Sequence, residues 1–376
     1  MKTTVLRNSL KEGLSTTERA VAKSSTLPIL GNILLSAEGA VLELAATDLE
    51  IGIRWRMLAK NTKPGRVVVP PRVLSQLLAL LSDQSVDLQT TASQLVLQSS
   101  EHTTTIKTLD PEEFPVIPSP KEGDSFFEID VPLLCQGLSQ VVGVVGQSQA
   151  RPEISGVFFC LQGKTLRLVA TDSFRLAERT ITVAGSVPKE WTCILPQKTA
   201  RELTSILGEK EGKVRLYASP TQVVFEYKNE DDPAQPHVQI ISRLIDGEYP
   251  QYQEVLPKDY KMRAVLDRAE FLNRIKAASL FAGKSNEVRV LVDEEQKGVE
   301  VSSRSQDLGE NASFLAGEIT GKDQAAASFN WRFLAEGLSS IREQNVQLGF
   351  NGDEGPAALM PSPAGEFLYI VMPIKA

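Results

Sequence analysis

The sequence predicts an α+β fold built from three similar domains, and three observations support this. A unit of about 125 residues recurs along the 376-residue chain. Each unit contains segments with the period-2 alternation of apolar residues that is typical of strands. Each unit also has two helical segments, which are too few to cover the crossovers of a doubly wound parallel sheet.

The repeat is clearest between the first two copies. Their matching segments are TLPILGNILL (26–35) and LELAATDLEIGI (42–53), against RPEISGVFFCL (151–161) and LRLVATDSFRLAE (166–178). A third, weaker copy has Ser305-Gln306 where the others have Thr-Asp. Thr and Asp side chains hold turns after strands, so the recurring pair favours a structural role.

In each unit a helix comes first, then strands, a second helix and further strands. The first helices are expected at 7–23, 131–147 and 267–284. The second helices are expected to follow Pro70, Pro196 and Asn330, because proline and asparagine suit a helix start. We place the domains at 1–124, 125–252 and 253–376, with SPKEGD (119–124) as a linker.

The composition is that of a soluble globular protein, with 42% apolar and 23% charged residues. No apolar stretch reaches the roughly 18 residues of a membrane span. Arg7 and Lys11 lie where a signal peptide needs its apolar segment. We therefore expect a cytoplasmic protein without membrane contact.

The sequence gives little support for a catalytic site or a metal site. Cys135, Cys160 and Cys193 have neither zinc nor redox spacing, so buried thiols are expected. His102 and His237 lie in polar sequence and are expected at the surface. No phosphate-binding loop occurs, and Ser173 has neither a glycine elbow nor a nearby histidine. We expect no catalytic residue, no metal site and no cofactor.

The charge is unevenly distributed. The chain carries a net charge of −7, which by itself argues against nucleic-acid binding. The six expected helical segments together carry +6, which leaves −13 for the rest of the chain. This asymmetry fits a basic lumen inside an acidic wall, although Lys and Arg also collect in helices because they favour helix formation.

Three similar units in one chain would form an arc, and matching ends close most simply through a two-fold dimer. Such a dimer would have twelve helices, and a helix of about 14 residues is about 21 Å long, comparable to a duplex width. The alternative is three domains in a row that dimerise elsewhere.

The chain resembles the family of the bacterial DNA polymerase III beta subunit, the sliding clamps, over its whole length. The segments that carry the resemblance are TLPILGN (26–32), EFPVIP (113–118), VATDSFRLA (169–177), DGEYPQYQEVLP (246–257) and YIVMPIKA (369–376). The resemblance implies three clamp domains, with antiparallel sheets outside and helices lining the lumen of a homodimeric ring. It implies a processivity factor associated with the nucleoid, which encircles double-stranded DNA without sequence specificity and is not an enzyme.

The implied partners are a clamp loader, the DNA polymerase III alpha subunit, and other polymerases and repair proteins that insert a short motif into a hydrophobic pocket. The matching pocket positions are Ile154, Thr171, Ser173, Phe174, Arg175, Leu176, Pro250, Val255, Asn330, Phe333, Met372, Pro373, Ile374 and Lys375. Apolar Met372 and Ile374 at a chain end suit a pocket that accepts varied peptides. Phe174 and Phe333 could supply its aromatic walls.

Other positions match DNA-facing and dimer-contact positions of the family. The DNA-facing candidates are Arg72, Arg151 and Lys198, joined by Arg7, Lys11 and Lys23 on charge and helix position. Ile106 and Leu280 match apolar contacts at the dimer joint, and Phe281 adjoins them; core packing is the alternative for these three.

The sequence departs from the family pattern at three places. Phe174 replaces an expected histidine, Glu254 an arginine that commonly lines the pocket, and Ser24 an arginine that commonly contacts DNA. Two further functional classes stay open: an enzyme, and a clamp-like paralogue that acts as a scaffold or resistance duplicate. A paralogue would share the fold and the pocket.

Overall fold

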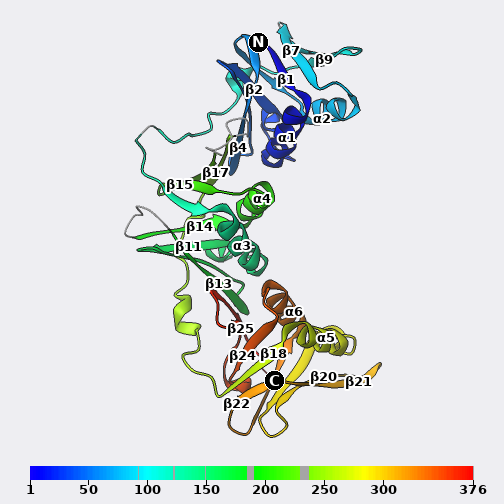
Figure 1. Ribbon diagram of the computed structural model, residues 1–376, viewed down its shortest axis with the longest axis vertical. Helices are drawn as coiled ribbons and strands as arrows, with labels where there is room; N and C mark the ends of the chain where they lie inside the picture. The colour runs from blue at the N-terminus through cyan, green and yellow to red at the C-terminus, as the bar shows by residue number, and fades with distance from the viewer. Residues whose placement is uncertain (92, 122, 149, 184–189, 229–236, 376) are drawn as a thin grey trace. The chain divides into compact units, whose positions relative to one another are not determined.

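The computed structural model describes residues 1–376 except 92, 122, 149, 184–189, 229–236 and 376 (Figure 1). The helices of the described residues are α1 (Arg7–Thr17), α2 (Pro71–Leu80), α3 (Val131–Val141), α4 (Gln197–Leu207), α5 (Arg268–Ser279) and α6 (Trp331–Ser340). They are separated by strands that form four sheets, in which neighbouring strands run antiparallel. The predicted α+β class with few helices is confirmed.

Two sheets belong to a first compact unit, which contains Met1–Leu134 and Glu202–Leu244. The five-stranded sheet has the order β5 (Lys60–Lys63), β1 (Lys2–Leu6), β7 (Ser85–Thr91), β8 (Gln94–Gln98) and β9 (Thr103–Lys107). The eight-stranded sheet has the order β10 (Phe127–Asp130), β15 (Lys213–Ala218), β16 (Gln222–Tyr227), β17 (His237–Arg243), β4 (Ile51–Leu58), β3 (Val41–Thr47), β2 (Ile33–Glu38) and β6 (Gly65–Val69).

Two further sheets belong to a second compact unit, which contains Cys135–Thr182, Pro188–Arg201 and Ile245–Ala376. The nine-stranded sheet has the order β14 (Glu190–Pro196), β11 (Gly156–Gln162), β12 (Thr165–Thr171), β13 (Arg175–Thr182), β26 (Phe367–Val371), β25 (Ala357–Ser362), β24 (Asn345–Phe350), β18 (Met262–Asp267) and β22 (Glu318–Gly321). The four-stranded sheet has the order β21 (Gly309–Ala316), β20 (Gly298–Ser305), β19 (Glu287–Asp293) and β23 (Gln324–Asn330).

Each large sheet joins strands from two repeats. In the first unit, β17 of the second repeat pairs with β4 of the first, with Ile241 opposite Gly52. In the second unit, β13 of the second repeat pairs with β26 of the third, with Leu176 opposite Ile370. The repeats are therefore linked by backbone hydrogen bonds as well as by the chain, and each junction brings a strand end of one repeat beside a turn of another.

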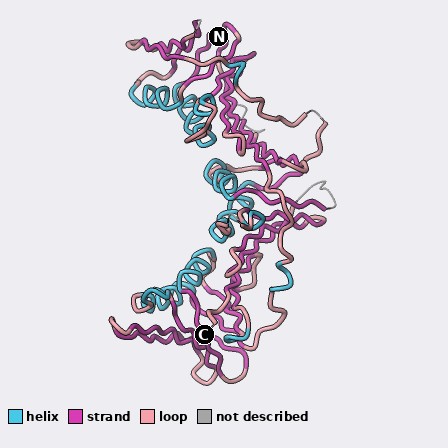
Figure 2. The backbone as a smooth tube through the Cα atoms, turned by 180° about the vertical axis from the view of Figure 1, so that it is seen from behind, coloured by secondary structure: helices cyan, strands magenta, loops and turns pink. Residues whose placement is uncertain are grey.

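The two helices of the first repeat contact each other, as do the two helices of the third repeat. In the first unit α1 packs on β3, β4 and α2, and in the second unit α5 packs on β20, β21 and α6 (Figures 1 and 2). Leu10 and Leu14 of α1 lie one helical turn apart and are fully buried. Gly13, on the same face, has no room for a side chain, because a Cβ there would lie 2.7 Å from Cδ1 of Trp55. Close helix–sheet packing in this unit therefore depends on glycine.

The expected helix starts are confirmed, but the first helix of each repeat ends earlier than predicted. Helix α2 begins at Pro71 directly after Pro70, and Asn330 caps α6 by accepting a hydrogen bond from the backbone N–H of Arg332 at 3.0 Å. In the first repeat the α-helix gives way to a 3₁₀ turn at Glu18–Ala20, after which Val21 takes an extended conformation. Apolar periodicity continues through such turns, so sequence alone overestimates the helix length.

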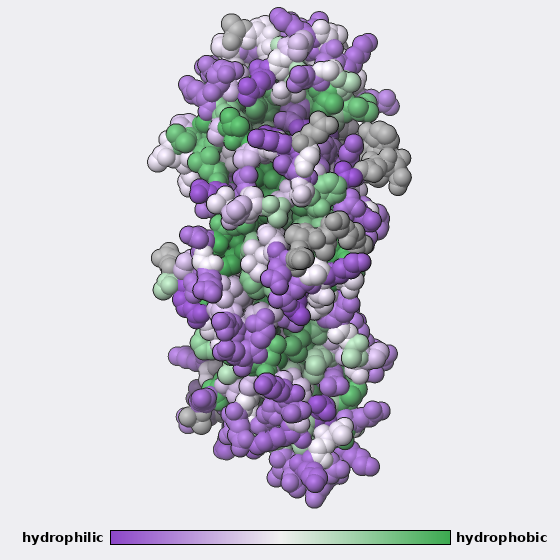
Figure 3. Space-filling view, turned by 90° about the vertical axis from the view of Figure 1, so that its left-hand side faces the viewer, coloured by the Kyte–Doolittle hydropathy of each residue, from purple (hydrophilic) through white to green (hydrophobic). Residues whose placement is uncertain are grey.

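The described residues contain no helix that is long and apolar enough to cross a membrane. All three cysteines are buried and unbridged, as expected, and burial raises the pKa of the Cys135 thiol to about 11. His102 is exposed, as expected, but the prediction for His237 was wrong: it is half-buried and its Nε2 lies 2.9 Å from Glu226. On the face seen in Figure 3, hydrophobic residues form patches between hydrophilic ones.

Candidate functional site

The turn between β12 and β13 forms one side of the candidate pocket. The Thr171 hydroxyl donates to the backbone carbonyl of Arg175 at 2.7 Å and accepts from the N–H of Ser173 at 3.1 Å. Asp172 Oδ1 accepts from the N–H groups of Phe174 and Arg175, each at 3.0 Å. These bonds hold Ser173 at a φ of 77°, in the left-handed region. They confirm the structural role predicted for the Thr-Asp pair.

Arg175 links this turn to α6. Its guanidinium is largely buried, forms an ion pair with Asp172 at 2.9 Å and a second with Glu336, and lies 4.4 Å from the centre of the Phe333 ring. Burial alone would lower its pKa, but hydrogen bonds and charges from Tyr369, Glu336 and Asp172 more than offset this and raise it. Arg175 is therefore a fixed cation that covers one face of the Phe333 ring.

The C-terminal segment is held against this turn by backbone hydrogen bonds. The N–H of Met372 donates to the carbonyl of Phe174 at 2.8 Å, and the N–H of Ile374 donates to the carbonyl of Ser328 at 2.8 Å. Met372 and Ile374 nevertheless leave 38% of their surface exposed, and Phe174 leaves 63%. Their backbones are thus fixed while their apolar side chains stay accessible, as a binding surface requires.

The segment between the second and third repeats provides another side. Tyr249 and Tyr252 are buried in a cluster with Leu176 and Ile370, and the Tyr252 hydroxyl donates to Glu178 at 2.5 Å. Burial, with a smaller contribution from Glu178, raises the pKa of Tyr252 well above its usual value, so the phenol stays a donor. The two tyrosines anchor a segment whose outer residues include half-buried Pro250 and Val255, which is 55% exposed.

The predicted pocket residues thus come from five segments of the second unit, which hydrogen bonds, an ion pair and apolar contacts join around the β13–β26 junction. Ile154 is buried, and the N–H of Gly146 links it to the turn by donating to the carbonyl of Ile154 at 3.0 Å and to that of Thr171 at 3.1 Å. Asn330 lies at the start of α6, Pro373 is half-buried, and Lys375 is exposed.

The sequence analysis missed several residues of this surface. Met360, Leu368 and Leu256 are half-buried and pack against the same cluster as Leu176 and Ile370. Met360 and Leu368 lie next in sequence to fully buried Leu359 and Tyr369. Alternation along the last two strands could have identified them, but only if the strand partners had been known.

The DNA-facing candidates are mostly exposed. Arg72 lies on α2, Lys198 on α4, Lys11 on α1, and Lys23 follows α1. Arg7 is half-buried, and its guanidinium donates to the backbone carbonyl of Leu81 and to Asn8 at 3.1 Å. Its guanidinium therefore has a structural role at the start of α1.

Arg151 also has a local partner. It forms an ion pair with Glu153 at 3.1 Å and donates to the Ser173 hydroxyl at 3.0 Å. This contact ties Arg151 to the turn of the candidate pocket and shows that Ser173 Oγ acts as an acceptor there, a role unlike that of a nucleophile awaiting a base.

The three candidates for a dimer contact differ in exposure. Leu280 follows the last residue of α5 and is 72% exposed, whereas Phe281 is half-buried. Ile106 lies on β9 and is 5% exposed, so packing within its own chain covers most of its surface. In the described residues, no group of three or more His, Cys, Asp and Glu side chains is arranged to hold a metal ion.

Comparison with known protein families matches the chain in three consecutive parts. Residues 1–118, 128–251 and 253–375 match the N-terminal, central and C-terminal domains of the DNA polymerase III beta subunit. Among curated proteins, the chain is 27% identical to a beta sliding clamp of Synechococcus elongatus over 383 residues, covering 100% of this chain and 99% of the relative. A beta sliding clamp of Staphylococcus aureus is 28% identical over 386 residues, with the same coverage.

Solved structures give the same result. The structure is similar to the DNA polymerase sliding clamp of Bacillus subtilis, with a TM-score of 0.93 and 26% identity over 100% of this chain and 99% of that chain. The DNA polymerase III beta subunit of Thermotoga maritima aligns with a TM-score of 0.88 and 28% identity at the same coverage. A Pseudomonas aeruginosa sliding clamp, 24% identical with a TM-score of 0.91, was solved bound to griselimycin and covers 100% of both chains.

Proposed function

Because this chain belongs to the family of the DNA polymerase III beta subunit, whose members are non-enzymatic processivity factors, we propose that it acts as a homodimeric ring on duplex DNA. The full-length match to sliding clamps in all three repeats carries this proposal. The ring would work in the cytoplasm and tether the replicative polymerase. We further propose that the chain has three domains, with boundaries near residues 124 and 252.

Two open sheet edges support closure of the ring. In the described residues, β9 ends the five-stranded sheet and β21 ends the four-stranded sheet, so one edge of each strand is unpaired. Unpaired edges pair readily with another chain. Helix α5 packs on β21, and exposed Leu280 follows its last residue. In a head-to-tail dimer, β9 of one chain would pair with β21 of its partner. Each of the two joints would then cover one Leu280 side chain.

The surface around Leu176, Val255, Met372 and Ile374 would receive a short motif from partner proteins. The side chains of Val255, Met372 and Ile374 are accessible over buried Leu176, and backbone hydrogen bonds fix Met372 and Ile374. A peptide of the form Gln-x-x-Leu-Phe should place its Leu and Phe on these residues and bind with micromolar affinity, about −8 kcal/mol. Exposed Glu254 gives the rim a negative charge, which would disfavour acidic residues next to the motif.

DNA would be held mainly by topology. The helical segments carry +6 in a chain of −7, and at a Debye length of about 10 Å only nearby charges act on the duplex. A lumen lined by these helices would attract phosphate weakly and without sequence preference, which permits sliding. An acidic outer wall would repel DNA that is not encircled.

The test is retention on circular DNA. The protein is loaded on a nicked circle by a clamp loader and ATP, and its dwell time is compared before and after the circle is cut. We expect retention for many minutes on the circle, rapid loss after cutting, and a more processive replicative polymerase. Equal dwell times would refute the ring. Topological retention without any effect on the polymerase would instead identify a clamp-like paralogue.

A further inference from the structure

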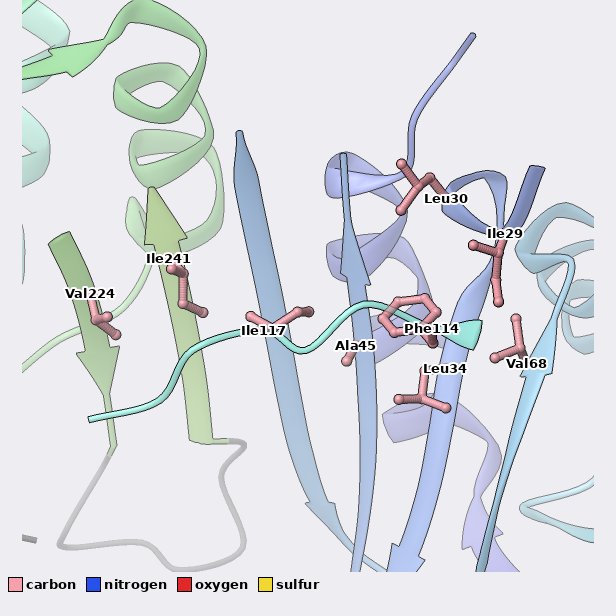
Figure 4. Packing of buried hydrophobic residues seen from close by; sticks show 9 residues of the cluster. All are labelled: Ile29, Leu30, Leu34, Ala45, Val68, Phe114, Ile117, Val224 and Ile241. Atoms are coloured by element: carbon pink, nitrogen blue, oxygen red, sulfur yellow. The ribbon is translucent and has the colours of Figure 1, made fainter. Parts of the chain in front are cut away.

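The first unit contains a cavity of about 320 Å³ at the junction of β4 and β17. It is lined by Gly52, Pro115, Val116, Ile241 and Arg243, among others. Figure 4 shows the segment that carries Phe114 and Ile117 crossing over the strands, with Ile117 beside Ile241. A volume near 300 Å³ is at the lower end of the range of ligand sites, and is enough for one or two side chains.

The turn beside this cavity repeats the turn of the candidate peptide pocket bond for bond. Leu49 has a φ of 76°, as Ser173 has 77°. The Thr47 hydroxyl accepts from the N–H of Leu49 at 3.0 Å and donates to the carbonyl of Ile51 at 2.9 Å. Asp48 Oδ1 accepts from the N–H groups of Glu50 and Ile51 at 3.0 and 2.9 Å. The same scaffold is thus built at both repeat junctions.

The neighbouring segments correspond as well. The N–H of Arg243 donates to the carbonyl of Glu50 at 2.8 Å, as that of Met372 donates to the carbonyl of Phe174 at 2.8 Å. Following the strand register and the repeat, Gly52, Pro115, Val116, Ile241 and Arg243 stand where Leu176, Pro250, Val255, Ile370 and Met372 stand in the candidate pocket.

Two of these correspondences change the chemistry. Gly52 replaces leucine, and Ile117 packs into the space that the leucine side chain would fill, because a Cβ at Gly52 would lie 3.0 Å from Cγ2 of Ile117. Arg243 replaces methionine; it is exposed, and its side chain has no ion pair or hydrogen bond within the described part of the chain. Glu50 lines the cavity too, but forms no ion pair with Arg243 among the described residues. An unpaired guanidinium beside an apolar hollow favours a carboxylate next to an apolar group.

We propose that this cavity is a second peptide-docking site, which takes an extended segment of a partner protein with a bulky apolar side chain followed by a carboxylate. The apolar side chain would enter the hollow lined by Val116, Ile117 and Ile241, and the carboxylate would pair with Arg243. This inference rests on the proposed peptide-binding role of the first pocket, whose architecture it shares, and it gives each chain two sites of different charge preference.

The test uses the full chain labelled with ¹³C at isoleucine δ1 methyls. The probes are four capped tetrapeptides, acetyl-Gly-Phe-Xaa-Gly-amide with Asp, Asn or Lys at Xaa, and a Gly-Ala-Asp-Gly control. We expect the Phe-Asp peptide to shift the methyl signals of Ile117 and Ile241 with a dissociation constant of about 1 mM, and the other three to bind more weakly. Ile117→Val and Ile241→Val assign the two signals.

Charge variants separate binding from folding. Arg243→Gln should weaken the Phe-Asp peptide about tenfold without affecting the Phe-Asn peptide, whereas Arg289→Gln, at an exposed arginine of β19, should change neither. Val116→Asp, at a side chain that is 93% exposed, should also weaken the Phe-Asp peptide. Unmoved Ile117 and Ile241 signals at about 5 mM peptide, or equal binding of the Phe-Lys peptide, would overturn the proposal. The signals of Ile370 and Ile374 report the first pocket independently, so failure of one site is distinguishable from failure of the other.

Discussion

Replacing Leu280 by aspartate should convert the proposed dimer into folded monomers. Leu280 is 72% exposed in the single chain, at the end of α5. The substitution therefore removes little packing within the chain, and the unfolding temperature should stay nearly unchanged. A closed two-fold dimer would instead cover this side chain at both joints.

The magnitude follows from the exposed area. Full burial of a leucine side chain stabilises by about 1.5–3 kcal/mol, so covering the exposed share of Leu280 contributes about 1–2 kcal/mol per joint. Two joints give about 2–4 kcal/mol, and a carboxylate buried without a partner costs several kcal/mol more. At about 1.4 kcal/mol per tenfold change, the dimer dissociation constant should rise at least 100-fold.

Sedimentation velocity from nanomolar to micromolar protein measures this shift. The wild-type chain should remain dimeric below micromolar concentration. Leu58→Asp, at a leucine of β4 that is 56% exposed, is a matched control that should leave the dimer intact. A Leu280→Asp chain that dimerises as tightly as the wild type would refute the joint, and a wild-type monomer at micromolar concentration would refute the ring.

Three further outcomes are expected. Deleting residues 372–376 should weaken a Gln-x-x-Leu-Phe peptide at least tenfold by calorimetry, about 1.4 kcal/mol, and leave the dimer intact; equal affinity would rule out the pocket. Replacing Arg72, Arg151 and Lys198 by glutamine should slow loading on circular DNA several-fold while the single-molecule dwell time stays unchanged, and a matching loss of dwell time would contradict topological retention. The pKa of Glu226 is lowered to about 2, first by the hydrogen bond from a neighbouring histidine, so its stabilisation is complete above about pH 4.5 and is lost as the pH falls toward 2. Glu226→Gln should therefore cost about 1–2 kcal/mol at pH 7 after allowance for solvent screening, and urea unfolding should show a shallower loss of stability below pH 5; an unchanged profile would contradict this.

The sequence predicts local structure here better than long-range pairing. Helix starts at Pro71 and Trp331 follow from capping chemistry, and the Thr-Asp turns follow from side chains that bond within four residues. Pairing of β13 with β26 joins residues almost 200 positions apart, and no local pattern encodes it. The apolar surface beside Leu176 forms only through that pairing. This explains why half-buried Met360 of β25 and Leu368 of β26 were not predicted.

Charged side chains were the hardest to predict. Arg175 is readily assigned to the pocket by its position after the turn, but its two carboxylate partners lie on the turn and on α6. His237 was expected at the surface because its neighbours in sequence are polar, yet the adjacent strand places Glu226 within hydrogen-bond reach. Which ionisable group becomes buried depends on the strand partner, since burial is costly without one.

The repeat of the sequence and the compact unit of the structure do not coincide. Each unit combines an outer repeat with part of the central one, because the large sheets run across the repeat boundaries. In the central repeat expressed alone, β17 would therefore lack its partner β4 and β13 would lack its partner β26. Two strand edges would then be unpaired. Such a fragment should aggregate, and insertions or deletions in the central repeat should propagate to both neighbours. The three copies are therefore not interchangeable, since removal of the central one would also leave β4 and β26 without their partners.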